Sequence, residues 1–178
     1  MTDRRLDTWL PDPAVRTHHR ASAAASPDDV WDAARSVRLA DTRTLGRVVR
    51  WRIPGLPADA TFDGLLRAYP FTVLEEDEHL LLSGLCGRIW TLQRDYPRLA
   101  SPEDFRYWDE RGTVRVLFAN WLESDGDRRT TLVAEARVAP VDQTAGLRLR
   151  ALWTVLGRFE RLIGAEALNA AMRRAEAR

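Results

Sequence analysis

The sequence predicts an α+β fold in which an antiparallel β-sheet curves around one long C-terminal helix. Two strand-like segments, residues 114–123 and 129–138, flank an Asp-Gly pair, which is a strong signal for a β-hairpin. From Ala145 onward, apolar residues recur at intervals of three and four, as in a helix that lies on a core. All 178 residues are expected to form one domain, which is an ordinary size for a single core.

The N-terminal part is expected to add one strand and two short helices. Residues 1–13 are polar and rich in proline, so a loosely ordered start is predicted; residues 15–25 can be extended. The Ser-Pro-Asp-Asp sequence at 26–29 suits a helix start, because serine caps, proline fits the first position and the aspartates meet the positive helix end. A second helix is expected from Asp41, and the Ile-Pro-Gly-Leu-Pro sequence at 53–57 ends it.

The middle of the chain changes from helical to strand-like character. Residues 61–67 predict one more short helical turn, and residues 71–74 a strand. An acidic turn is expected at 75–78, followed by a strand within the apolar run 79–92. The aromatic and proline-containing segment 95–109 is interpreted mainly as a loop that leads into an edge strand.

The C-terminal helix should begin after Asp142, which can cap it. Gly157 and Gly164 lie seven residues apart near one face, and each costs about 1 kcal/mol relative to alanine in a helix interior. Two explanations remain open: a close approach to a ligand or to the sheet, and a bend that wraps the helix around the core, which is favoured. The predicted apolar stripe comprises Ala145, Leu149, Leu152, Trp153, Leu156, Phe159 and Ile163.

Composition excludes several classes of function. All 27 basic residues are arginine and 26 residues are acidic, so the net charge of +1 argues against a nucleic-acid partner. The single cysteine, Cys86, excludes an internal disulfide and fits a reducing, cytoplasmic location. His18, His19 and His79 lack the spacing of a zinc site, so no metal is expected. A secretion signal and an apolar run of the roughly 20 residues needed for a membrane span are also absent from the sequence.

The order of these segments resembles the START-like or SRPBCC superfamily, the helix-grip fold of polyketide cyclases, dehydratases and lipid carriers. Residues 26–31 are similar to the first helix of that family, while 80–90 and 130–138, followed by the long helix, resemble a group of uncharacterised bacterial members. The resemblance covers residues 15–176. It implies a cavity between the concave face of the sheet and the C-terminal helix, with no cofactor.

Residues on the elements around such a cavity are the predicted ligand contacts. Tryptophan is frequent, and these rings either form aromatic walls for an apolar ligand or fill the core. The predicted ligand-binding residues are Arg88, Trp90, Trp121, Ala134, Ala136, Leu149, Trp153 and Leu156.

Three functions are compatible with this sequence. The first, which it favours, is binding or carriage of an apolar, lipid-like or polyketide-like small molecule. The second is an enzyme of the cyclase or dehydratase type, which needs a polar group such as Glu135 or Arg137 inside the cavity. Because Ala134 and Ala136 are the better inward candidates, Glu135 and Arg137 are expected to face solvent. The third is a protein-interaction module with a filled core.

Overall fold

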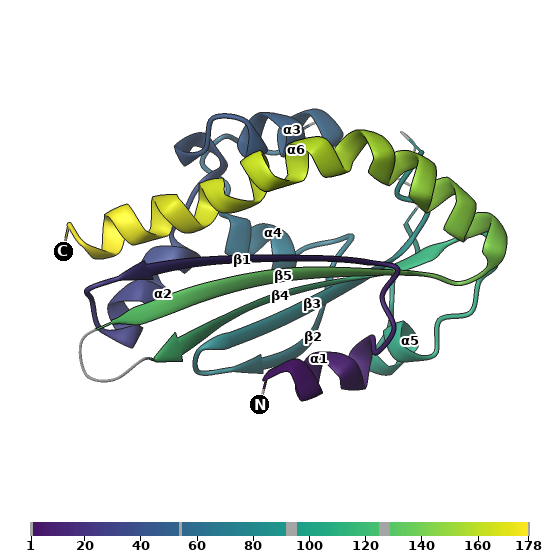
Figure 1. Cartoon of the computed structure of the whole chain (residues 1–178), viewed down its shortest axis with the longest axis horizontal. Helices are drawn as coiled ribbons and strands as arrows, with labels where there is room; N and C mark the ends of the chain where they lie inside the picture. Colours follow the sequence, from purple (N-terminus) through teal and green to yellow (C-terminus); the bar gives the residue numbers. More distant parts are fainter. Residues whose placement is uncertain (1, 54, 92–95, 125–128, 178) are drawn as a thin grey trace.

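The computed structural model describes residues 2–53, 55–91, 96–124 and 129–177. Five antiparallel strands form one sheet in the order β1-β5-β4-β3-β2, and a long helix crosses one face of it (Figure 1). This α+β arrangement is the predicted helix-grip fold. The strands are β1 (Val15–Ala23), β2 (Thr72–Asp77), β3 (Leu80–Gly87), β4 (Val114–Ser124) and β5 (Thr130–Pro140).

Helices cover both faces of the sheet. The long C-terminal helix, α6, arches over the concave face together with α2, while α1 and α5 lie on the opposite, convex face (Figure 1). The helices are α1 (Thr2–Trp9), α2 (Pro27–Arg35), α3 (Leu45–Arg52), α4 (Phe62–Arg67), α5 (Pro102–Arg106) and α6 (Gln143–Ala175), with a 3-10 turn, η1 (Leu39–Asp41).

The local signals in the sequence correctly mark several boundaries. The Ser26 hydroxyl accepts a hydrogen bond from the Asp29 amide at 3.2 Å and caps α2. The Asp142 carboxylate accepts one from the Ala145 amide at 2.8 Å and caps α6. Strands β4 and β5 pair as predicted, although the turn at 125–128 lies outside the described residues.

Other boundaries differ from the sequence predictions. The second helix begins at Leu45, and Asp41 belongs to the preceding 3-10 turn. Strand β2 extends through most of the expected acidic turn, and β3 ends at Gly87, whose φ of +139° no other residue adopts easily. The expected loop after β3 contains α5, which starts with the capping box of Ser101 and Asp104.

The N-terminal segment folds as helix α1, so the expectation of a loosely ordered start is wrong. Leu6 and Leu10 are fully buried and Trp9 is nearly so, because these three side chains share one helical face. They pack on the convex face of the sheet with Leu117 and Val133.

Beneath α1 lies a buried ion pair. Glu135 and Arg137 are only 2% and 1% exposed, so the expectation that they face solvent is also wrong. The Arg137 guanidinium donates to Glu135 at 2.6 Å, to Asp7 of α1 at 2.5 Å and to the Leu10 carbonyl oxygen at 3.0 Å. Arg16 pairs with Glu135 at 2.9 Å. The alternation of β5 does turn both side chains away from the concave face, as expected, but α1 covers them.

We expect Arg137→Met to lower the free energy of unfolding by about 3–5 kcal/mol, because it removes a partner of a buried carboxylate. The matched control is Arg20→Met on the same face of the sheet, where an exposed arginine pairs with Glu123. That change should cost at most about 1 kcal/mol. Urea denaturation followed by circular dichroism measures both. Equal losses for the two variants would show that the buried pair does not stabilise the fold.

Candidate functional site

The register of the sheet aligns two rows of side chains on the concave face. Directly paired residues share a face, so each row runs across neighbouring strands. We call the two rows together the central floor. The first row is Thr17, Ala136, Phe118, Ser83 and Val73, and the second is His19, Ala134, Asn120 and Leu81.

Apolar clusters attach both ends of α6 to the sheet. At its N-terminal end, Ala145 and Leu149 pack against Val116 and Val138. At its C-terminal end, the buried residues Leu168, Ala171 and Met172 pack with Leu81, Leu132 and residues of α2. The helix is thus fixed at two places, one on either side of the central floor.

Around Leu156, between these clusters, part of the apolar stripe of α6 is left uncovered. Leu156 lies seven residues after Leu149 and therefore on the same helical face, yet it is 44% exposed where Leu149 is 1% exposed. Trp153 on this face is half-buried. Below, Ala134 and Ala136 supply only methyl groups, and both remain half-buried. The side chains of Phe159 and Ile163 lie outside the described residues.

One pair of ionisable groups spans the space between helix and sheet. His19 of β1 contacts the Glu160 carboxylate of α6 through its Nε2 atom, and both side chains are largely buried. His18 faces the other way, with its ring 6.1 Å from that of Trp121, since neighbouring residues of a strand point to opposite faces. An imidazole in contact with a carboxylate is an arrangement that can donate or accept a proton.

A close approach to the sheet explains Gly164. A Cβ atom at this position would lie 2.1 Å from His19 Nε2, so no larger residue fits unless the imidazole moves. The prediction that a bend accounts for the glycine is therefore wrong at this position, although α6 does arch (Figure 1). At Gly157 a Cβ atom would lie 3.1 Å from Trp153 Nε1.

Two polar groups around the concave face have no partner among the described residues. The Ser83 hydroxyl is fully buried in the first row of the central floor, and the Trp90 Nε1 atom is buried near the start of α6. Leaving such a group unsatisfied costs about 1–3 kcal/mol, so each is a favourable contact for a polar atom of a ligand.

The structure brings together some of the predicted ligand contacts and separates others. Ala134, Ala136 and Leu149 lie on the concave side, and Trp90 packs near Leu149. Trp153 and Leu156 continue the same stripe of α6 after Leu149.

The structure places Trp121 and Arg88 away from the concave side, where they were expected. Trp121 lies on the convex face, where its Nε1 atom donates to Glu123 at 3.1 Å. Arg88 follows the end of β3 and is exposed, because the chain leaves the sheet at Gly87.

Phe118, Ser83 and the partnership of His19 with Glu160 were not predicted from the sequence. Phe118 and Ser83 become neighbours through the pairing of β3 with β4, whose register depends on the whole sheet. His19 and Glu160 are 141 residues apart. For Phe118 the sequence carried one signal, because alternation within β4 places this side chain on the same face as Val116.

A small cavity lies beside the second row of the central floor. Its volume is about 60 Å³, compared with roughly 300–1,000 Å³ for typical small-molecule sites. It is lined mainly by apolar side chains of α2, α4, α6 and the sheet, including Trp31, Phe62, Leu81, Asn120, Leu132 and Leu168.

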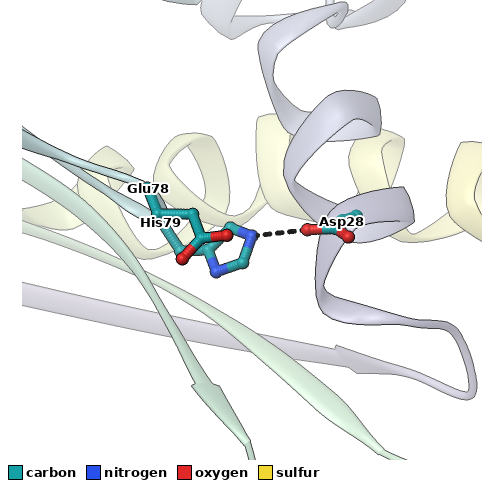
Figure 2. Close-up of side chains that lie close together, drawn as sticks. All are labelled: Asp28, Glu78 and His79. Carbon is teal, nitrogen blue, oxygen red and sulfur yellow. Dashed lines mark hydrogen bonds and ion pairs between the residues drawn. The ribbon is translucent and has the colours of Figure 1, made fainter.

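A separate group of charged side chains lies where the β2–β3 turn meets α2. Figure 2 shows the His79 ring pointing toward Asp28, with Glu78 next to it; the His79 Nε2 to Asp28 Oδ1 distance is 2.9 Å. Within the part of the chain that the structure describes, ligand atoms of these three residues lie within 4.8 Å of one another, close enough to hold a divalent metal ion. Their direct effect is to join the turn to α2, aided by the edge contact of His79 with Trp31.

No protein-family model matches the sequence, and no curated protein matches it either. Solved structures resemble the fold at low identity. A hypothetical protein from Helicobacter pylori is 10% identical over 95% of this chain and 93% of its own, with a TM-score of 0.41. The Zhui aromatase/cyclase from Streptomyces sp. R1128 is 17% identical over 92% and 94%, with a TM-score of 0.36. Norcoclaurine synthase from Thalictrum flavum is 13% identical over 89% and 84%, with a TM-score of 0.40. Likenesses at this level do not identify a ligand or a reaction.

We expect Gly164→Ala to destabilise the protein by about 1–3 kcal/mol, since the added methyl group would overlap the His19 ring. In a His19→Ala background the same change should instead stabilise the protein by about 1 kcal/mol, because only the helix propensity of alanine then remains. Thermal unfolding of the two single variants and the double variant measures this reversal of sign. A loss of the same size in both backgrounds would contradict the close contact between α6 and β1.

Burial determines the chemistry of Cys86, which packs on the convex face with Leu82 and Phe105. Desolvation raises the pKa of its thiol to about 12, so at pH 8 only about one molecule in ten thousand carries the reactive thiolate. We expect Ellman's reagent to leave Cys86 unmodified in the native protein at pH 8. In urea, as a control, it should react fully. Rapid reaction of the native protein would show that β3 is accessible to the reagent.

Proposed function

We propose that the protein binds an apolar small molecule, lipid-like or polyketide-like, between the central floor and α6. The observation that carries the proposal is the 44% exposure of Leu156, which shares a helical face with Leu149 in a helix whose two ends are packed on the sheet. Burying a leucine side chain is favourable by about 1.5–3 kcal/mol. A ligand placed between Leu156 and the small residues Ala134 and Ala136 would bury all three.

The chemistry of the surrounding groups fits a ligand with a large apolar part and few polar atoms. Phe118 and Trp153 offer ring surfaces, which dominate the energetics of apolar binding. The Ser83 hydroxyl and Trp90 Nε1 are unpartnered donors that can fix the orientation of a carbonyl or hydroxyl oxygen. Binding or carriage of such a ligand requires no additional chemical group.

The contact of His19 with Glu160 favours an enzyme of the cyclase or dehydratase type as the second candidate. A carboxylate that holds an imidazole in place allows the imidazole to move a proton to or from a bound carbonyl compound. An interaction module with a filled core, the third function, is disfavoured because several residues of the central floor, including Ala134 and Ala136, remain partly exposed.

Filling the proposed site between the central floor and α6 with a larger side chain tests the proposal. We expect Ala136→Phe to weaken the binding of an apolar fluorescent probe, 1-anilinonaphthalene-8-sulfonate, by about tenfold or more, because the added ring occupies the proposed site. The matched control is Ala24→Phe at an exposed position just after β1, which should leave the dissociation constant unchanged. Native mass spectrometry of the wild-type protein, taken from its own cells, identifies any bound compound. Equal probe affinity for the three proteins would overturn the proposal.

A further inference from the structure

Helix α3 presents an exposed face on which large apolar side chains stand among arginines. Trp51 is 68% exposed and Val48 is 42% exposed. They are three residues apart and so lie on one side of the helix. We call the exposed set Arg43, Arg47, Val48, Arg50 and Trp51 the α3 patch.

Contacts with the rest of the protein fix this orientation. The Glu166 carboxylate of α6 accepts hydrogen bonds from the backbone amides of Thr44 at 2.9 Å and Leu45 at 3.0 Å. Burial acts to raise the pKa of Glu166, but these amides outweigh it and hold the pKa below its usual range. Gly46 packs so closely that a Cβ atom would lie 2.0 Å from the Leu39 carbonyl oxygen. The opposite side of α3 is therefore held outward.

The surroundings of the patch are cationic, although the whole chain is nearly neutral. Residues 42–58 contain four arginines and no acidic residue. Figure 1 shows α3 alongside α6 and away from the sheet, and the exposure of Val48 and Trp51 shows that the described residues leave its outer side accessible.

We propose that the α3 patch docks onto the surface of a bilayer that contains anionic lipids. Arginine guanidinium groups pair with lipid phosphates, while Trp51 and Val48 enter the interface, where an indole ring is favourably placed. Among the described helices, none is both long and apolar enough to cross a membrane, so the contact is peripheral. This inference stands apart from the proposed ligand site, since it rests on a different surface.

The apolar residues distinguish a bilayer from a nucleic acid. Phosphate contacts on DNA or RNA need only the arginines, and they gain nothing from Val48. A lipid interface uses both kinds of side chain, because binding strength depends on buried apolar area as well as on charge. The mixture of exposed Trp51 and Val48 with flanking arginines therefore favours lipid.

The test is co-sedimentation of the full chain with vesicles of phosphatidylcholine alone or mixed with phosphatidylglycerol. We expect binding to the mixed vesicles only, weakened by salt through screening. Arg47→Glu/Arg50→Glu should lower the affinity at least about twentyfold, and Trp51→Ala by about fivefold to tenfold. The matched charge control is Arg4→Glu/Arg129→Glu, two exposed arginines outside the patch, which should retain the wild-type affinity within about twofold.

Three results would overturn the proposal. One is failure of the wild-type protein to bind mixed vesicles at low salt. Another is an equal loss of affinity in the patch variant and the charge control, which would indicate a general effect of net charge. The third is tight binding of duplex DNA that depends on Arg47 and Arg50, combined with an unchanged vesicle affinity of Trp51→Ala, which would assign the patch to nucleic acid. Circular dichroism of each variant confirms that it is folded, since the substituted side chains are exposed.

Discussion

The attachment of α6 at two separate places is the constraint on which the concave side of this protein depends. A helix of 33 residues extends over the sheet, and its apolar stripe is satisfied by one cluster around Leu149 and another around Leu168. Between them the helix arches, and the sheet beneath carries alanines. The half-exposed Leu156, the contact of His19 with Glu160 and the glycine at 164 all follow from this geometry.

The convex face is held together by a buried ion pair as well as by apolar packing. There α1 covers the sheet and buries the charged Glu135 and Arg137, whose partners Arg16 and Asp7 reach them from the partly exposed rim. A buried ion pair contributes little net stability compared with apolar packing, but breaking it is costly. Its charged groups are therefore satisfied in only one arrangement of the surrounding residues. This network therefore fixes the position of α1 and keeps the charges of Glu135 and Arg137 on the convex side.

The two proposals concern the same side of the molecule and are connected through α6. Glu166 holds the start of α3, and Glu160, six residues earlier, contacts His19 in the central floor. A protein that takes up an apolar compound from a bilayer would need a lipid-facing surface near the ligand site, and this arrangement supplies both features on one helix.

The sequence by itself determined the class of fold, because periodicity and capping are local properties. The Asp-Gly hairpin, the caps at Ser26 and Asp142 and the stripe of α6 each depend on residues close together in the chain. Alternation likewise placed Ala134 and Ala136 on the concave face.

Only the tertiary structure decided which residues meet across long separations. Trp121 was expected in the cavity and lies on the convex face, because the register of β4 against β3 and β5 cannot be derived from one strand. Glu135 and Arg137 were expected in solvent, but a helix that precedes them by about 130 residues covers them. The pairing of His19 with Glu160 depends in the same way on how α6 crosses β1. Side-chain alternation assigns a face, whereas what lies opposite that face is set by the packing of the whole chain.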